Sequence, residues 1–205
     1  MPTIRNKSTQ AQQGFTIIEL LIATAVFSVV LLVFVFSFIR IGEMFYKGVN
    51  LSNTQETARN AVQNIASDLQ FYGGNNMQLG TINQGYFCVG NNRYSFKMGA
   101  QYIPNSASNF GLVKELTNCV PPSSQAPNFS NAEELLDPGM SLNSLTVTCD
   151  GFGLCAVAMH VVFYGSDPTV LLPNAQDPNA QCSGSYNSTQ YCATADYSST
   201  VLQKF

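Results

Sequence analysis

Residues 14–22 read Gly-Phe-Thr-Ile-Ile-Glu-Leu-Leu-Ile, and they open a long apolar segment. Between Phe15 and Ile39, Glu19 is the only charged residue, and neither proline nor glycine interrupts the run. An α-helix rises about 1.5 Å per residue, so a segment of this length reaches roughly 37 Å and can cross a hydrocarbon core about 30 Å thick. Because the segment is apolar around its whole circumference, it needs apolar surroundings on every side. The sequence therefore predicts a helix over residues 15–39 that lies in a membrane or in the core of a helical bundle.

The residues before this segment distinguish it from an ordinary secretory signal. Residues 1–14 carry Arg5 and Lys7 and no acidic residue, which favours a cytoplasmic leader. In a secretory signal peptide the small-residue cleavage site follows the apolar stretch. Here Gly14 precedes it, so cleavage after Gly14 would remove the leader and leave the hydrophobic segment on the mature protein. An ordinary single-pass anchor is the alternative, and it explains the length of the segment but not the presence of Glu19.

Glu19 is the candidate functional residue of the apolar segment. A carboxylate in hydrocarbon is costly, so an ionisable residue there indicates a function. Cleavage after Gly14 would create a new α-amine on Phe15, four residues before Glu19. The amine of one subunit and Glu19 of its neighbour could then pair in an apolar bundle. Such a pair would fix the axial stagger between subunits, because losing either partner leaves a buried charge unpaired.

Gly14, Phe15 and Glu19 together resemble the prepilin signature of type IV pilins and type II secretion pseudopilins. The resemblance implies that a dedicated membrane peptidase cleaves after Gly14 and N-methylates the new N-terminal Phe15. It also implies that Glu19 acts in docking to neighbouring subunits. The local resemblance covers about residues 10–40, and the order of the later elements is similar to the family at the level of architecture.

The second half of the helix is expected to be amphipathic. Apolar or small residues recur in steps of four and three at Ala58, Val62, Ile65, Leu69 and Tyr72. This stripe is expected to pack on a sheet; a coiled-coil seam is the less favoured alternative because the stripe runs for only about two heptads. The residues that lie mostly off the stripe, and are expected to face water or other subunits, are Glu56, Arg59, Gln63 and Asp68. Gly73 or Gly74 is expected to end the helix.

After the helix, the pattern changes to short strands separated by turn residues. A hairpin is predicted from residues 86–89 and 93–98 around Gly90-Asn91-Asn92, followed by a short strand at 110–116. A helical turn is expected at 133–136, and a second hairpin from residues 145–149 and 155–164. Residues 165–205 are predicted to be mostly irregular. The fold class is therefore α+β and pilin-like, with a long N-terminal helix whose amphipathic half packs on an antiparallel sheet, and a disulfide-stapled, loop-rich C-terminal region.

This pattern divides the chain of 205 residues into four parts. Residues 1–14 form a leader peptide and residues 15–39 a transmembrane or filament-core helix. Residues 40–74 form the amphipathic half of the helix, and residues 75–205 form a globular head with antiparallel strands. The net charge of −3 and the lack of a basic patch give no electrostatic case for nucleic-acid binding.

All six cysteines follow the apolar segment, which indicates three disulfides in an oxidising compartment. Among the possible pairings, the ones that join neighbours along the chain are favoured: Cys88–Cys119, Cys149–Cys155 and Cys182–Cys192. Zinc is the competing interpretation. No C-x2-C pair occurs, and the only histidine, His160, is not spaced as a ligand, so neither a metal site nor a cofactor is expected.

The sequence contains no recognisable catalytic constellation, and a non-enzymatic protein is predicted. His160 lies between Met159 and Val161 in an apolar strand, where a hydrogen-bonded sheet histidine is expected. The carboxylates of Glu133, Glu134 and Asp137 cluster in a predicted loop. A solvated face is favoured over an acid/base pair.

The resemblance implies a minor pilin or pseudopilin, most similar to a pilus-tip subunit or a J-type pseudopilin, in a type IV pilus or type II secretion-like filament. The implied partners are other pilin subunits, the prepilin peptidase, an inner-membrane assembly platform and membrane lipid. The chain would sit in the inner membrane with its head outside the cytoplasm, and then in a cell-surface or periplasmic filament. The alternative is a tip-exposed adhesin or DNA-uptake binding module on such a filament.

Overall fold

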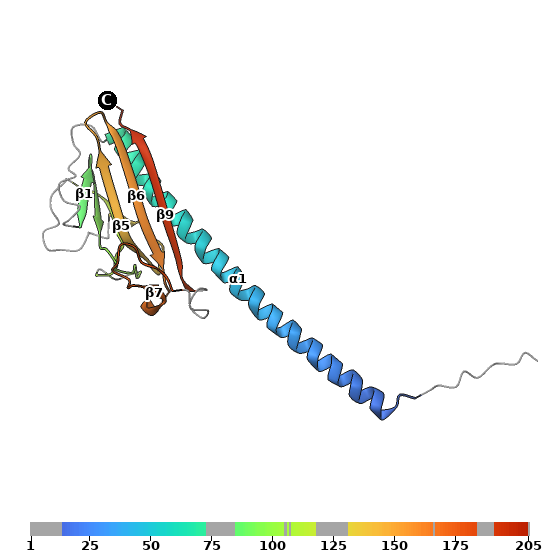
Figure 1. The fold of residues 1–205 in the computed structure, drawn as a ribbon. Helices are drawn as coiled ribbons and strands as arrows, with labels where there is room; N and C mark the ends of the chain where they lie inside the picture. Colours follow the sequence, from blue (N-terminus) through green and yellow to red (C-terminus); the bar gives the residue numbers. More distant parts are fainter. Residues whose placement is uncertain are drawn as a thin grey trace, which may run out of the picture. The chain divides into compact units, whose positions relative to one another are not determined.

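The computed structural model of the chain describes residues 14–72, 85–104, 106, 108–117, 131–165, 167–183 and 191–204. The chain divides into two compact units, one ending at Gly42 and the other beginning at Glu43. Helix α1, Ile17–Tyr72, contributes to both units, and all the described strands belong to the second (Figure 1).

In the first unit, α1 has no packing partner within the chain. Every described residue up to Ile41 is exposed, including the large apolar side chains of the segment 15–39. Among the described residues, α1 is the one helix long and apolar enough to cross a membrane. The predicted N-terminal apolar helix is therefore confirmed, and its surroundings must come from outside the chain.

In the second unit, α1 buries the predicted apolar stripe. Ala58, Val62, Ile65 and Leu69 are fully buried, as predicted. The prediction is wrong for Tyr72, which is 58% exposed. Tyr72 is the last residue of α1 and lies beside the β1–β2 turn, where a Cβ added to Gly90 would come within 2.6 Å of the Tyr72 Cβ. The stripe therefore ends one turn earlier than its spacing indicates.

A four-stranded antiparallel sheet packs on this half of α1. Its strands, in sheet order, are β1 (Tyr86–Val89), β2 (Asn92–Phe96), β3 (Leu112–Leu116) and β4 (Ala132–Glu134). The first predicted hairpin and the short third strand are confirmed. The predicted helical turn over residues 133–136 is wrong, because residues 132–134 pair with residues 113–115 of β3.

A three-stranded antiparallel sheet packs on the same helix. Its order is β5 (Met140–Cys149), β6 (Leu154–Phe163) and β9 (Ala193–Leu202). The second predicted hairpin is confirmed, but β5 begins at Met140 rather than Leu145. The register shifts between Leu142 and Ser144, and the buried Asn143 at this irregularity interrupts the alternation of apolar and polar residues that the prediction relied on.

The prediction of a mostly irregular C-terminal region is wrong for β9. This strand pairs with β6 along its whole length, from Ala193 opposite Phe163 to Leu202 opposite Leu154. Only Ala193 and Ala195 of β9 are buried, and the remaining side chains are exposed or half-buried. A strand built mainly from Ala, Ser and Thr gives a weak apolar signal, although its backbone pairing is complete.

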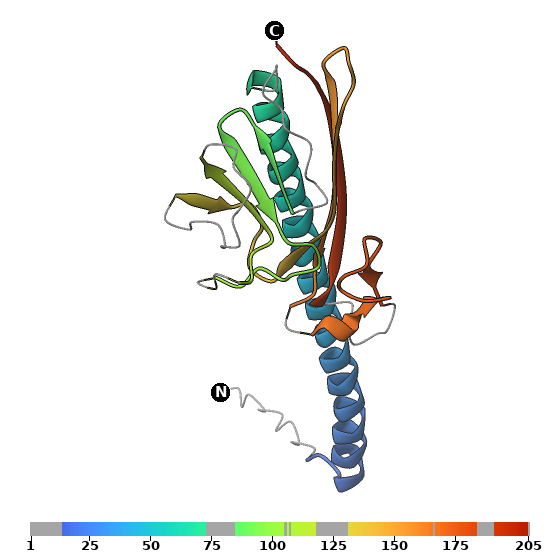
Figure 2. The ribbon, with the colours of Figure 1, turned by 90° about the vertical axis from the view of Figure 1, so that its left-hand side faces the viewer.

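Figures 1 and 2 show both sheets lying along the second half of α1. One apolar core joins the helix to the two sheets; its largest fully buried members include Ile65, Leu69, Phe87, Tyr94, Leu112, Leu142, Val157 and Val161. A smaller cluster lies under the 3-10 helix η2 (Pro168–Val170) and the short strands β7 (Leu171–Leu172) and β8 (Gln181–Cys182). The region before β9 therefore has a small core of its own.

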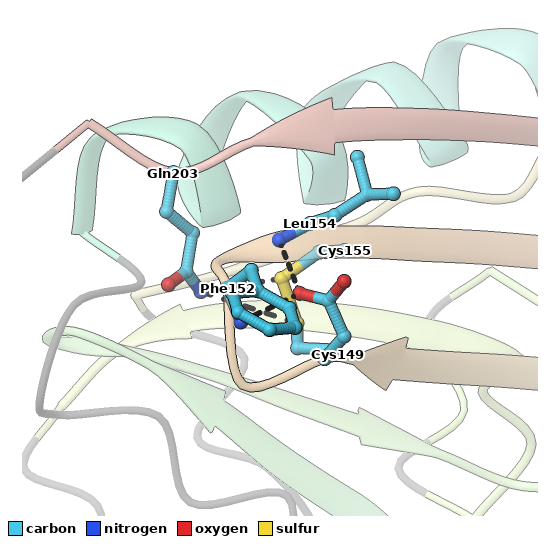
Figure 3. Close-up of a disulfide and its surroundings, with 6 residues drawn as sticks. Cys149, Phe152, Leu154, Cys155 and Gln203 are labelled. Carbon is cyan, nitrogen blue, oxygen red and sulfur yellow. Dashed lines mark hydrogen bonds between the residues drawn. A yellow bond between two sulfur atoms is a disulfide. The ribbon is translucent and has the colours of Figure 1, made fainter.

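Two of the three predicted disulfides are present in the structure. Cys149–Cys155 joins β5 to β6 beside their connecting turn (Figure 3), and Cys182–Cys192 joins β8 to the residue before β9. At the turn, Asp150 Oδ1 accepts hydrogen bonds from the backbone N–H groups of Phe152 and Leu154. The predicted partner of Cys88, Cys119, lies outside the described residues, so that pairing stays a prediction.

The prediction that Asp68 lies on a solvated polar face of α1 is wrong. Asp68 is buried, with only 8% of the residue exposed, rather than solvated. Asp68 Oδ2 accepts hydrogen bonds from the Tyr94 hydroxyl and from Asn92 Nδ2, each over 2.6 Å, and lies 2.8 Å from Lys114 Nζ. One helix carboxylate thus ties α1 to β2 and β3.

Tyr94 should make the head sensitive to alkaline pH. Burial, reinforced by the Asp68 carboxylate, raises the pKa of Tyr94 far above its ordinary value. The folded head therefore holds the proton while the unfolded chain releases it, so this contribution to stability is present below about pH 10 and is lost as pH rises above it. We expect the free energy of unfolding to fall by up to about 1.4 kcal/mol per pH unit more steeply than in Tyr94→Phe.

Urea unfolding of the detergent-solubilised chain at pH 8, 9.5 and 11 would measure this difference. The Tyr94→Phe chain is the matched control, because the other tyrosines titrate in both proteins. Equal pH slopes in the two chains would contradict the prediction.

Candidate functional site

The three residues of the predicted processing and docking site, Gly14, Phe15 and Glu19, lie at or just before the start of α1. The helix begins at Ile17, so Thr16 is the N-cap residue and Glu19 is the third helical residue. Thr16 N and Thr16 Oγ1 donate to Glu19 Oε2 over 2.9 and 2.8 Å, and Glu19 N donates to Thr16 Oγ1 over 3.3 Å. This reciprocal arrangement is a capping box, which satisfies two backbone N–H groups that a helix start leaves without partners.

Sequence reasoning interpreted Glu19 as a docking residue and missed the capping box. The signal was available, because Thr16-Ile17-Ile18-Glu19 has the spacing of a Ser/Thr followed three residues later by an acid before an apolar run. Both bonds to the carboxylate use Oε2, and none of the hydrogen bonds among the described residues uses Oε1. The second carboxylate oxygen can therefore accept a donor from another molecule while the cap stays intact.

Gly14 and Phe15 precede the helix and are open to solvent. Both lie in the non-helical stretch before Ile17, and Phe15 is 84% exposed. A Cβ added at Gly14 would meet nothing within 4 Å. An exposed peptide bond outside the helix is accessible to a peptidase active site. The capping box uses no atom before Thr16, so cutting the Gly14–Phe15 bond would leave it in place.

The hydroxyl groups within the apolar segment are satisfied by the helix itself. Thr24 Oγ1 donates to the carbonyl of Leu21 over 3.0 Å. Ser28 and Ser37 each donate to the carbonyl four residues earlier over 2.8 Å. Since hydroxyls without partners are disfavoured in hydrocarbon, these bonds suit the segment to lipid or to a helical bundle. Glu19 remains the one ionisable side chain between Phe15 and Ile39.

Elsewhere, the candidate residues of the head have structural partners. His160 is buried, with Nδ1 2.7 Å from Asp196 Oδ1 and Nε2 2.9 Å from the carbonyl oxygen of Ala180, which confirms the predicted hydrogen-bonded sheet histidine. In the described ranges, no group of three or more His, Cys, Asp or Glu residues could hold a metal ion.

The predicted solvated cluster of carboxylates is wrong for Glu134. Glu134 accepts hydrogen bonds from the backbone N–H groups of Gly111, Leu112 and Leu136, at 3.0, 2.7 and 3.3 Å. Burial raises the pKa of Glu134, and these donors oppose the shift. Asp137 is exposed but accepts a hydrogen bond from Thr57 Oγ1 over 2.5 Å. Glu134 therefore serves as an acceptor for backbone N–H groups, and Asp137 as an acceptor for a hydroxyl group of α1.

The N-terminal site has a counterpart among known families. Residues 9–35 match the family described as the Prokaryotic N-terminal methylation motif. No curated protein and no solved structure matches the chain significantly. The motif supports a type IV pilin-like prepilin, which implies a structural subunit that is processed by prepilin peptidase and assembles with other pilin subunits. The exposed apolar helix and the motif together fit membrane anchoring.

Proposed function

We propose that this chain is a minor pilin or pseudopilin, a structural subunit of a type IV pilus or type II secretion-like filament. Cleavage after Gly14 and N-methylation of Phe15 convert the precursor into the mature subunit. The single observation that carries the proposal is the order of features within the matched motif: a basic leader, a glycine, and an apolar helix with one carboxylate in its first turn.

The geometry of Glu19 supports a role in assembly. Its Oε2 caps its own helix, and its Oε1 is available to the α-amine on Phe15 of a neighbouring subunit. In an apolar bundle this ion pair sets the axial position of one helix against the next, since any other stagger strands a charge. The exposed apolar surface of residues 15–39 supplies the rest of the contact, because burying such surface contributes about 25 cal/mol per Å².

The proposed organisation follows from this role. Residues 1–14 are the leader, 15–39 the membrane and filament-core helix, 40–74 the amphipathic half, and 75–205 the head. The precursor is stored in the inner membrane with its head outside the cytoplasm, and an assembly platform there draws it into the filament. A long, cysteine-containing head suits contacts at the tip or during priming better than dense repetitive packing, which favours a minor subunit.

Mass spectrometry of filaments purified from the host tests the proposal. The mature chain is expected to lack residues 1–14 and to carry a methyl group on Phe15, and the same preparation should contain other subunits with prepilin motifs. A chain that keeps its leader, or that is absent from filaments whose assembly is unaffected by its deletion, would refute it. Filaments that form without the chain but no longer attach to their target would instead favour a tip-exposed binding module.

A further inference from the structure

β9 is the edge strand of its sheet, and the opposite edge strand, β5, is bridged near its start. There, Leu142 and Ser141 of β5 form isolated bridges with Met98 and Gln101 of the same chain. β9 pairs with β6 on one side, and no strand among the described residues pairs with its other side. An edge strand presents a row of backbone donors and acceptors that can pair with another chain.

The hydrogen-bond pattern identifies which residues of β9 face this open edge. Gln203 N donates to the carbonyl of Gly153 over 2.9 Å, which continues the β6–β9 ladder by one pair. In antiparallel strands the hydrogen-bonded pairs alternate, so the odd-numbered residues of β9 bond β6. The N–H and C=O groups that point outward then belong to Thr194, Asp196, Ser198, Thr200 and Leu202. Within the described parts of the chain, no backbone hydrogen bond reaches them.

This edge lacks the features that normally prevent strand pairing. Exposed edges are usually protected by lysine, proline, a bulge or a short strand. β9 is ten residues long, has no lysine or proline, and keeps an unbroken register with β6. Its single charged residue, Asp196, is exposed with Oδ1 2.7 Å from His160 Nδ1, and the other outward-facing residues are uncharged. The edge is therefore open to an incoming strand.

A polar groove lies beside the first part of this edge. It has a volume of about 830 Å³ and runs between α1 and residues Thr194–Tyr197 of β9. The helix wall carries hydroxyl and amide groups together with one acid and one base: Ser52, Gln55, Glu56, Arg59, Asn60 and Gln63. These groups can hydrogen-bond small polar side chains, and they offer no apolar pocket for a large one.

We propose that β9 binds an extended segment of a different filament subunit, which adds to the sheet as an antiparallel strand. The main-chain groups of the five outward-facing residues provide the affinity, and the polar wall of α1 selects small polar side chains on the facing side of the segment. This proposal rests on the proposed function, because it needs a neighbouring subunit held next to the head.

A second copy of this chain does not fit by antiparallel pairing of its own β9 with this β9. The last residues of β9 lie at the end of α1, where Lys204 N donates to the carbonyl of Gln70, while Thr194 lies beside Ser52–Gln63, so β9 runs in the direction of α1. Antiparallel pairing of two β9 strands would place the Glu43 ends of the two helices at opposite ends of the pair. Subunits that leave one membrane in the same orientation cannot meet in this way.

Photo-crosslinking in filament-producing cells tests this surface. A benzophenone amino acid replaces Thr200, and the adduct is mapped by mass spectrometry. We expect one adduct, to an extended segment of another prepilin-type subunit. Ser198→Pro removes an outward N–H without removing a bond to β6, and Ser198→Lys adds a charge to the edge; each should lower the adduct yield at least about tenfold. Ser198→Ala, the matched control, should change it less than about twofold.

The processing state separates the two proposals. A chain that is trimmed and incorporated but forms no adduct, an adduct between two copies of this chain, or an adduct unchanged by both Ser198→Pro and Ser198→Lys would overturn the β9 proposal alone. A chain that is neither trimmed nor incorporated would overturn the proposed function and the β9 proposal with it. Protease resistance of the head in each variant shows that lost adducts do not reflect unfolding.

Discussion

A chain carrying Glu19→Gln is expected to insert into the membrane and start its helix normally, yet to enter filaments at least about tenfold less than the wild type. Glutamine at this position can still accept the hydrogen bond from Thr16 N, so the capping box is retained. What it loses is the negative charge that would meet the amine of a neighbour. Leaving one partner of a buried ion pair unpaired costs about 3–5 kcal/mol, which is ample for a tenfold loss.

Thr16→Ala separates the two roles of Glu19. This variant removes the hydroxyl that accepts from Glu19 N and donates to Oε2, while the carboxylate charge remains. The helix start should lose about 1 kcal/mol, and incorporation should stay near the wild-type level. Quantitative immunoblotting of sheared filaments against whole cells measures incorporation. If Glu19→Gln assembles normally while Glu19→Ala does not, the role of Glu19 is helix capping and the docking proposal is wrong.

A chain carrying Gly14→Leu is expected to keep residues 1–14 and to remain in the membrane. Gly14 is exposed with open space around it, so the substitution should not disturb the fold. A bulky side chain next to the Gly14–Phe15 bond should instead obstruct the active site of the peptidase. Without cleavage no amine forms on Phe15, and the charged leader stays attached to a helix that must enter an apolar bundle. We expect at least about a hundredfold less incorporation than in the wild type.

Gly48→Leu is the matched control for this prediction. Gly48 also has nothing within 4 Å of an added Cβ, but it lies in α1 well after the apolar segment. The same substitution there should leave trimming unchanged. Intact-mass measurement of both chains gives the result directly, and a Gly14→Leu chain that begins at Phe15 would contradict the cleavage proposal.

The features that could be predicted from sequence are those encoded locally. The apolar run from Phe15 to Ile39 defines its helix by composition alone, and the first hairpin is marked by turn residues between two short strands. The short disulfides could also be anticipated, because each joins neighbouring cysteines at the end of a strand or loop. None of these depends on knowing what packs against the segment.

The features that were missed depend on tertiary partners. β9 forms a strand because β6 offers a complete edge for pairing, although its own residues give little apolar signal. Asp68 lies off the apolar stripe of α1, where a solvated residue is expected. It is buried because Tyr94 and Lys114 of the sheet contact it. The capping box is different: Thr16 and Glu19 have its spacing in the sequence, but a carboxylate in an apolar run also predicts docking, and the spacing does not choose between the two roles.

The position of β9 also determines when the head can finish folding. If the chain is exported from an N-terminal anchor, as we propose, α1 is delivered first and residues 193–204 much later. These late residues supply Ala195 and Tyr197 to the core that α1 begins. The chain after β9 is fixed to the last turn of α1. There, Lys204 N donates to the carbonyl of Gln70, and the Lys204 ammonium lies 5.0 Å from the Phe71 ring centroid. Contacts between such distant parts of a chain form slowly. On the proposed route, a newly exported head therefore stays incomplete until residues 193–204 have also crossed the membrane.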